Sequence, residues 1–175
     1  MRIEEDIKLD YADVLFRPKR STLSSRKDVE LKRTYNFKYS NHQWSGIPII
    51  AANMDGVGEI SIAKNLAKFD MMTCLTKQHS SRDIKRNSIV KEIYPHLMIS
   101  TGTSKEDFKR LNEILKEFSF FEFICIDIAN GYSDHFSKFV RSVREKYPTK
   151  TIIAGNVVTA DMTQELVMSL SLIHI

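Results

Sequence analysis

Five short apolar segments recur at a nearly constant interval, and this regularity constrains the fold more than any other feature of the sequence. They begin at Ile47, Met71, His96, Phe123 and Thr151. Successive starts therefore lie 24 to 28 residues apart. Each segment is almost continuously apolar instead of alternating, which is typical of strands buried on both faces of a parallel sheet. The sequence therefore predicts five consecutive strands of one parallel sheet.

The segments between these strands have the pattern of amphipathic helices. In residues 104–118 the apolar positions recur at spacings of three and four, so they share one helical face. Ser104 followed by Asp107 indicates a capping box with an acid at its third helical position. Residues 133–148 repeat the pattern, and Pro148 ends the helix. A strand followed by a crossover helix at this interval predicts repeated βαβ units.

Two features favour a (β/α)8 barrel over an open doubly wound sheet. The first turn reads NMDGVGE, which lacks the GxGxxG pattern that an open sheet usually has at its ligand site. In addition, small or polar residues end every predicted strand, and a barrel collects such residues at its carboxyl-terminal face. These residues are Asn53, Asp55, Lys77, Gln78, 101–103, Asp127, Asn130, Gly155 and Asn156.

The length of the chain predicts a truncated barrel. The complete fold takes about 250 residues and eight strands, whereas residues 47–169 contain about five βα units. Residues 1–46 have no clear βα unit and are expected to form an N-terminal extension. Residues 170–175 are expected to be a non-native tail, since the end of the sequence is one translation of a transposon-end adapter used in sequencing libraries. We expect such a half-barrel to leave its first and fifth strands with open edges.

Composition argues against several classes of partner. The formal net charge is +4, and the basic residues are scattered, which makes a nucleic-acid partner improbable. No apolar run approaches the roughly 20 residues of a membrane-spanning helix, and the acidic start MRIEEDIK lacks the apolar core of a signal peptide. Cys74 and Cys125 lie in apolar runs, so we expect buried thiols in a reducing cytoplasm and no metal site.

Several long motifs in one order resemble the guanosine monophosphate (GMP) reductase branch of the IMP dehydrogenase/GMP reductase family. The likeness runs collinearly from the first residue to about Ser169. No inserted regulatory domain follows the second strand, which favours the reductase over the usual dehydrogenase plan. The motifs are DVLFRPKRSTLSSR (13–26), PIIAANMDGVG (48–58), STGTS (100–104), DIANGYSDHF (127–136) and PTKTIIAGNVVT (148–159).

The resemblance implies a (β/α)8 barrel in a homotetramer that carries out the NADPH-dependent reductive deamination of GMP to IMP and ammonia. In that chemistry a cysteine attacks the purine C2, ammonia leaves, and hydride reduces the covalent thioimidate. A monovalent cation, K+, is expected in the full-length protein. Two alternatives are an IMP dehydrogenase that lacks a regulatory domain and a non-catalytic nucleotide-binding half-barrel.

The resemblance assigns catalytic roles to Lys77 and Asp127. Asp127 matches the family acid beside the cofactor, with Ile128 and Ala129 on the same stretch. From its position alone, it would be assigned to capping the helix that follows. Lys77 matches a lysine that acts near the cofactor and the departing ammonia, although a lysine at a strand end is ordinarily a solvated charge. The family reads closer to HKHY here, so KQHS assigns no role to Gln78.

Four further residues are implied by the resemblance. Ser25 and Arg26 match a pair that reaches the cofactor of a neighbouring subunit, although Ser-Ser-Arg-Lys is also ordinary loop composition. Met54 and Asn156 are expected to bind the substrate. Gly56 stands where the family commonly has threonine, so this turn lacks a side-chain hydroxyl.

Neither cysteine is expected to be the nucleophile, because both lie within predicted strands. The family nucleophile lies in a glycine-rich loop after the sixth strand, together with the cation site and the segments that bind the GMP phosphate. Those motifs are absent from this sequence. We therefore expect the isolated chain to have no GMP reductase activity.

Overall fold

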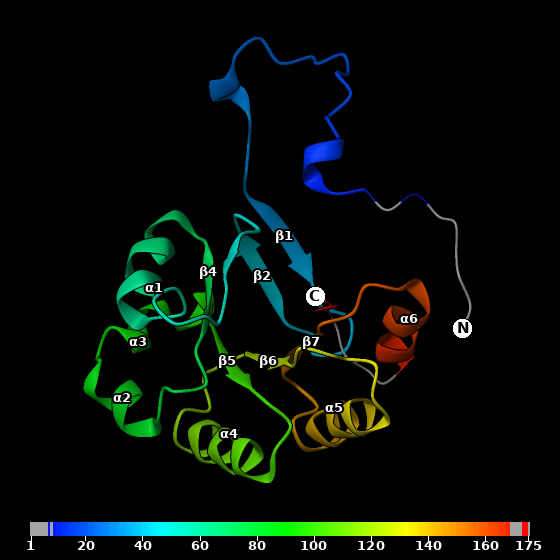
Figure 1. Ribbon diagram of the computed structural model, residues 1–175. Helices are drawn as coiled ribbons and strands as arrows, with labels where there is room; N and C mark the ends of the chain where they lie inside the picture. The colour runs from blue at the N-terminus through cyan, green and yellow to red at the C-terminus, as the bar shows by residue number, and fades with distance from the viewer. Residues whose placement is uncertain (1–6, 8, 169–172, 175) are drawn as a thin grey trace. The chain divides into compact units, whose positions relative to one another are not determined.

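The computed structural model describes Ile7, residues 9–168 and residues 173–174 (Figure 1). The chain divides into two compact units, Met1–Glu30 and Leu31–Ile175. Each unit is described by itself.

The first unit contains two short 3-10 helices, η1 (Tyr11–Asp13) and η2 (Arg26–Asp28). Each begins with a capping box, in which the side chains of the N-cap and the third helical residue bond to each other's backbone. Every described side chain of this unit is exposed, including those of Leu15 and Phe16. The unit therefore builds no core from its described residues.

The second unit contains a curled half-barrel of parallel strands, which confirms the predicted truncated (β/α)8 fold. The strands follow one another in the sheet in chain order, so every connection is a crossover. The five predicted strands all form, at the predicted places in the chain. The strands are β3 (Ile50–Ala51), β4 (Met72–Leu75), β5 (Leu97–Thr101), β6 (Phe123–Asp127), β7 (Thr151–Gly155) and β8 (Ile173–His174).

Helices cover the outer face of the curled sheet (Figure 1). The predicted capping box of Ser104 and Asp107 is confirmed at the start of α4, and the Ser133 hydroxyl caps α5 by accepting a hydrogen bond from the Phe136 N–H at 3.2 Å. The α-helices are α1 (Ile60–Leu66), α2 (Ser81–Arg86), α3 (Val90–Ile93), α4 (Lys105–Glu117), α5 (Asp134–Lys146) and α6 (Ala160–Met168), with 3-10 helices η3 (Ala67–Phe69) and η4 (Tyr94–His96).

Side chains alternate along the strands between two separate cores. The outward-facing side chains pack beneath the helices, and they include Leu75, Leu97, Ile99, Ile124, Ile126, Ile152 and Ala154. The inward-facing side chains form a second core inside the curl, with Met72, Cys74, Met98, Phe123, Cys125 and Ile153. Because both faces are buried, both sets must be apolar, which explains the continuous apolar runs of the sequence.

A hairpin that the sequence did not predict lies at the amino-terminal ends of the strands. Strands β1 (Arg33–Asn36) and β2 (Gln43–Gly46) pair antiparallel. Trp44 of β2 is buried in the inner core, and the ring of Phe37 lies edge-on to Phe123 with centroids 5.6 Å apart. The hairpin belongs to the second unit, although the sequence pattern groups it with the extension 1–46. Its strands RTYN and QWSG carry too few apolar residues to reveal it.

The expectation that the fifth predicted strand has an open edge is wrong, because strand β8 pairs with it. Ile173 and His174 pair in parallel with Ile153 and Ala154 of β7. The edge of the fifth predicted strand is therefore occupied at these positions, because backbone pairing requires no particular side chains. The other residues of the predicted tail, 170–172 and 175, lie outside the described residues.

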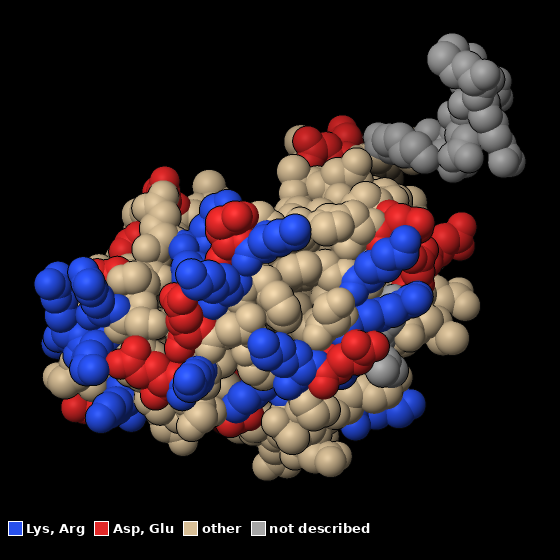
Figure 2. All heavy atoms as spheres, turned by 90° about the horizontal axis from the view of Figure 1, so that it is seen from below, with Lys and Arg blue, Asp and Glu red and all other residues tan. Residues whose placement is uncertain are grey.

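Charged side chains of both signs are interspersed on the molecular face in Figure 2. Two exposed ion pairs illustrate this mixing, Lys85 with Glu117 at 3.1 Å and Lys138 with Asp134 at 3.7 Å. Exposed pairs of this kind contribute little to stability. On this face, therefore, basic and acidic side chains lie among one another.

Candidate functional site

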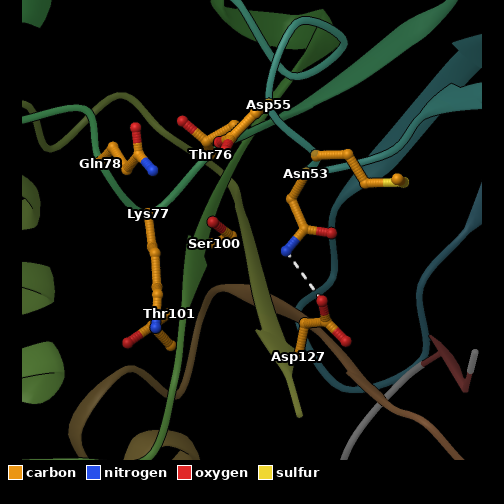
Figure 3. Close-up of a pocket in the computed structure, with 9 residues that line it drawn as sticks. Asn53, Asp55, Thr76, Lys77, Gln78, Ser100, Thr101 and Asp127 are labelled. Carbon is orange, nitrogen blue, oxygen red and sulfur yellow. Dashed lines mark hydrogen bonds between the residues drawn. The ribbon is translucent and has the colours of Figure 1, made fainter. Parts of the chain in front are cut away.

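A pocket of about 520 Å³ lies where strands β4, β5 and β6 end and the turn after β3 begins (Figure 3). It has the size of an ordinary small-molecule site. Most of its lining residues are of polar type, and they come from four successive βα connections or strand ends. The lining residues are Asn53, Met54, Asp55, Thr76, Lys77, Gln78, Ser100, Thr101 and Asp127.

Asp127, the last residue of β6, lies on one side of this pocket beside Asn53. The Asn53 amide donates a hydrogen bond from Nδ2 to Oδ2 of Asp127 at 2.8 Å. Asp127 is half-buried, and its carboxylate can accept several hydrogen bonds, so lone pairs remain for a ligand. The Asn53 bond fixes the carboxylate, and Asp127 is thus a fixed acceptor at the pocket wall.

Lys77 lies on the other side of the pocket, in a turn that follows β4 (Figure 3). Its side chain is exposed and carries a compact ammonium with three donors. Gln78, for which the sequence predicted no role, lines the pocket next to it. The pocket thus presents a cationic donor and an anionic acceptor from different strands, which suits a polar ligand with groups of both kinds.

Ser100 and Thr101 add hydroxyl groups to the polar lining. The Ser100 hydroxyl donates to the Leu75 carbonyl at 2.6 Å, and the Thr101 hydroxyl donates to the Gly102 carbonyl at 3.0 Å. Each hydroxyl proton is therefore used within the protein, and each oxygen is left as an acceptor. These hydroxyls favour a ligand with N–H or O–H donors.

A neighbouring cavity of about 360 Å³ shares Asn53, Met54 and Asp127 with the pocket and also includes Asn156. The two predicted substrate residues are thus brought together beside Asp127. Met54 is mostly exposed, with 63% of its surface accessible. The turn that follows it contains Gly56 in the left-handed region, at φ +75°, where a non-glycine residue is disfavoured.

The two cysteines line the floor of this second cavity but are poor nucleophiles. Both are free thiols, each about 2% exposed. The neighbouring Cys125 thiol, burial and the charge of Asp127 raise the pKa of Cys74 well above its ordinary value. Since the thiolate is the reactive form, Cys74 stays protonated and unreactive. That neither cysteine acts as the nucleophile stays a prediction, and the burial of both thiols favours it.

The remaining predicted cofactor residues lie outside the pocket lining. The Ile128 N–H donates to the Gly155 carbonyl at 2.9 Å, and its side chain packs against the helix-side core, while Ala129 is exposed. Ser25 and Arg26 belong to the first compact unit, where Ser25 caps η2 by accepting from the Lys27 N–H at 3.2 Å. The structure therefore places Lys77 and Asp127 in the lining of one pocket, and Met54 and Asn156 in the lining of the neighbouring cavity.

Several lining residues were not assigned to the site from the sequence. Asn53, Thr76, Ser100 and Thr101 all lie within two residues of the carboxyl end of a strand. That position was a usable signal, since carboxyl ends of parallel strands meet at one edge of a barrel. No pattern along the chain indicated that Asn53 would bond to Asp127, because three βα units separate them.

The residues that the structure describes form neither a metal-ligating cluster nor a membrane-spanning helix. Among them, no group of three or more His, Cys, Asp or Glu side chains could hold a metal ion. In the same part of the chain, every helix is too short or too polar to cross a membrane.

A model of the IMP dehydrogenase / GMP reductase domain matches residues 8–172. GMP reductases of Escherichia coli O81 (strain ED1a), Citrobacter koseri and Shigella boydii serotype 4 are each 54% identical over 171 residues. Each alignment covers 97% of this chain and 49% of the relative. The chain therefore spans about half the length of the curated relatives it matches.

A solved structure also has this fold. The crystal structure of inosine 5' monophosphate dehydrogenase from Legionella pneumophila superimposes with a TM-score of 0.71 at 21% identity. The likeness covers 91% of this chain and 47% of that chain. At this identity the match supports the fold alone.

Proposed function

Because the chain belongs to the IMP dehydrogenase/GMP reductase family, we propose that it forms the cofactor side of a GMP reductase. The reaction is the NADPH-dependent reductive deamination of GMP to IMP and ammonia. The observation that carries this proposal is the pocket that Lys77 and Asp127 line from the ends of different strands. The 54% identity to GMP reductases favours this reaction over that of an IMP dehydrogenase.

The residues of the pocket suit the nicotinamide end of the cofactor. When bound, NADPH supplies the hydride that reduces the purine. Asp127, fixed by Asn53, accepts a hydrogen bond from the carboxamide N–H and so orients the ring. Lys77 supplies a proton donor on the facing side, near the position of the departing ammonia. The hydroxyl oxygens of Ser100 and Thr101 offer further acceptors.

The substrate occupies the neighbouring cavity in this proposal. Met54 offers an apolar surface for the purine, and Asn156 offers an amide with both donors and acceptors. The cavity shares Asp127 with the cofactor pocket, so the two ligands would meet beside this carboxylate. Such contact is what a direct hydride transfer requires.

We propose that the 175-residue chain by itself does not turn over GMP. Its thiols are buried, and the raised pKa of Cys74 keeps that group protonated. In this proposal the nucleophilic cysteine and the K+ site lie in the half of the full-length protein that this chain does not span, since the chain covers 49% of its relatives.

A homotetramer is proposed for the full-length protein, with Ser25 and Arg26 reaching the cofactor of a neighbouring subunit. Arginine suits this role because its planar guanidinium binds phosphate with two parallel hydrogen bonds. The exposure of Leu15 and Phe16 supports an intermolecular role for the first unit, since large apolar side chains are normally covered.

Calorimetric titration of the purified chain tests the proposal. We expect saturable binding of NADPH, and at least tenfold weaker binding by Asp127→Asn, because a charged hydrogen bond contributes about 1.5–3 kcal/mol. Asp134→Asn, which changes an exposed carboxylate at the start of α5, is the matched control and should bind like the wild type. Preference for NAD+ and IMP would contradict the proposal, as would equal binding by Asp127→Asn. Mixed with GMP and NADPH, the chain should show no loss of NADPH absorbance.

A further inference from the structure

The turn that carries Lys77 is held by side chains that lie outside the pocket. We infer that Arg110 and Glu59 are positioning residues that fix Lys77 at the pocket wall. This inference rests on the proposed function, in which Lys77 is a catalytic residue. Neither Arg110 nor Glu59 lines the pocket, and neither was singled out by the sequence.

The Lys77 turn, residues 76–79, is a tight reversal of the chain. The His79 N–H donates to the Thr76 carbonyl at 3.2 Å, which places Lys77 and Gln78 at the two central positions of the turn. At its start, the Thr76 N–H donates to the Gly58 carbonyl at 3.0 Å. Gly58 permits this approach, since a Cβ there would lie 2.4 Å from the Cys74 carbonyl oxygen. The start of the turn is therefore fixed by backbone contacts.

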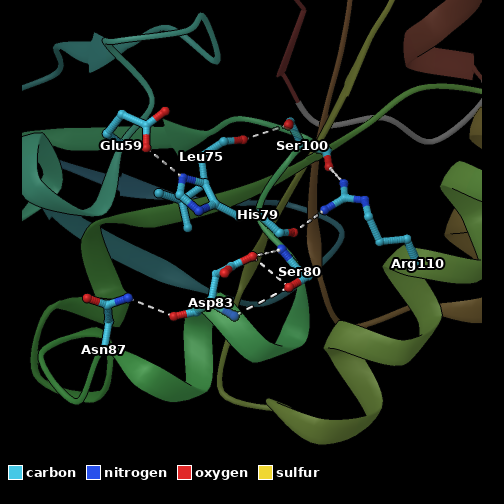
Figure 4. Close-up of polar contacts among 8 residues, drawn as sticks. All are labelled: Glu59, Leu75, His79, Ser80, Asp83, Asn87, Ser100 and Arg110. Atoms are coloured by element: carbon cyan, nitrogen blue, oxygen red, sulfur yellow. Dashed lines mark hydrogen bonds and ion pairs between the residues drawn. The ribbon is translucent and has the colours of Figure 1, made fainter.

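The far end of the turn is held by Arg110 of helix α4 (Figure 4). Its guanidinium donates from Nη1 to the His79 carbonyl at 2.8 Å, and from Nη2 to the Ser100 carbonyl. Ser100 belongs to β5 and lines the pocket. One planar group thus joins the end of the Lys77 turn to the neighbouring strand, and its two donors fix both direction and distance.

The His79 side chain is held from the opposite direction. Its Nε2 lies 3.1 Å from Oε2 of Glu59, the N-cap residue of α1. The imidazole is largely buried, with 15% of the side chain exposed, while Glu59 is 37% exposed. Residue 79 is therefore hydrogen-bonded through its carbonyl to α4. Its ring lies within ion-pair distance of the carboxylate at the start of α1, and this contact is attractive when the imidazole is protonated.

The residue after the turn is also fixed. The Asp83 carboxylate accepts hydrogen bonds from the Ser80 N–H at 2.8 Å and from the Ser80 hydroxyl at 2.6 Å, which begins helix α2 (Figure 4). The turn is thus bounded by a capped helix on one side and a buried strand on the other. Within this frame, Arg110 and Glu59 contact the turn with side chains from helix α4 and from the start of α1.

The pocket depends on this arrangement because Lys77 itself is exposed. A free lysine side chain loses much conformational entropy when it is placed against a ligand. A fixed backbone reduces this entropy loss, because it holds the Lys77 Cα, from which the side chain extends, in one position. Removing Arg110 should therefore move Lys77 without removing any group that touches the ligand.

The test uses the complete chain with its lysines converted to 13C-dimethyl-lysine, which keeps their charge. The Lys77 methyl resonance is assigned by its disappearance in Lys77→Arg. In Arg110→Met, we expect this resonance to move to its position in the urea-unfolded chain, and NADPH binding to weaken about tenfold. Arg110→Lys, which keeps the positive charge but lacks the planar fork that donates to both carbonyls at once, should give an intermediate shift.

Arg144 provides a matched control. Its guanidinium is also largely buried and donates to backbone carbonyls, those of Tyr147, Pro148 and Lys150, at the amino-terminal end of β7. Arg144→Met should lower the thermal midpoint yet leave the Lys77 resonance and NADPH binding unchanged. An unchanged Lys77 resonance in folded Arg110→Met overturns the inference, as does an equal shift in Arg144→Met.

Glu59→Gln keeps the inference testable if Arg110→Met does not fold. The amide keeps the size of the carboxylate but loses its charge, and the Lys77 resonance should shift in the same direction as in Arg110→Lys. A shift in neither variant contradicts the inference. Failure of the proposed function is distinguishable, because the wild-type chain would then not bind NADPH, whereas the resonance shifts are read without any ligand.

Discussion

The two ends of the parallel strands differ in chemistry, although the same strands connect them. At the amino-terminal ends, the hairpin side chains of Phe37 and Trp44 pack on Phe123 and Met72, around an apolar cavity of about 190 Å³. At the carboxyl-terminal ends, the larger pocket is lined mainly by polar groups. In (β/α)8 enzymes the amino-terminal ends of the strands serve stability, and the carboxyl-terminal ends carry the active site. The two ends of the half-barrel differ in their linings in the same sense.

Two arginines show the same division at the level of single residues. Arg110 and Arg144 both lie on helices that cover the sheet, and both donate to backbone carbonyls. Burial lowers the pKa of each guanidinium from its ordinary value, although an arginine remains charged. Arg110 donates to the end of the Lys77 turn, and Arg144 donates to the residues that follow α5. The same type of contact therefore lies beside the candidate site in one case and away from it in the other.

The largest expected effect comes from opening the apolar end. Phe123→Ala should lower the free energy of unfolding by about 3–5 kcal/mol, since the ring is fully buried and its removal leaves a cavity. Urea unfolding followed by circular dichroism measures this loss. The dissociation constant for NADPH should not change in the fraction that stays folded.

Phe69→Ala is the matched control, because that ring is 62% exposed and should contribute little. Equal losses in both variants would show that the hairpin end does not stabilise the half-barrel. A weakened NADPH affinity in folded Phe123→Ala would show that the apolar end also affects ligand binding at the polar end.

A smaller effect is expected at the polar end. Asn53→Ala removes the hydrogen bond to Asp127, whose net contribution is about 1.5–3 kcal/mol for a charged acceptor. We expect NADPH to bind about tenfold more weakly by calorimetry, with a small change in unfolding free energy. Asn65→Ala removes a similar amide bond, to the Ser61 carbonyl on exposed helix α1, and should leave binding unchanged. Equal binding by both variants would remove Asn53 from the site.

The smallest effect is a pH dependence located at the apolar end. Burial lowers the pKa of His42 and His96 below their ordinary value of 6.5. For His96, Asp70 at 3.9 Å opposes this shift and Lys32 adds to it. A neutral imidazole suits the buried site of the folded state better than a charged one. Because the pKa is lower in the folded state than in the unfolded state, the stability that the neutral histidine contributes is fully present above about pH 6.5 and is lost as the pH falls through the lowered pKa.

Urea unfolding at a series of pH values checks this prediction. The midpoint should fall as the pH is lowered from about 7 to about 5. The fall should be smaller in His96→Gln, which cannot be protonated, than in the wild type. The same slope in both proteins would show that His96 does not contribute.

The regular elements were predictable because their signals are local. The continuous apolar runs, the spacings of three and four, and the pair Ser104 and Asp107 all lie within short windows of sequence, and each appears where it was expected. The hairpin was missed because RTYN and QWSG have no apolar alternation. Strand β8 was missed because its pairing with β7 depends on backbone groups.

The candidate site was predictable only in part. Lys77 and Asp127 stand at strand ends, and the family resemblance distinguished them from other strand-end charges. Arg110 has no comparable signal, since it lies in the middle of an amphipathic helix where a solvated arginine is ordinary. Its contacts with His79 and Ser100 exist only after α4 packs across the ends of two strands.

By itself, the sequence determined that the chain forms a parallel βα repeat and which residues end its strands. It did so because burial on two faces and helical amphipathicity are both encoded by periodicity along the chain. The tertiary structure alone decided that Asn53 bonds to Asp127, that Trp44 closes the inner core, and that Arg110 reaches the Lys77 turn. Each of these contacts joins groups far apart along the chain, and only the curvature of the sheet brings them within the few ångströms at which hydrogen bonds and packing act.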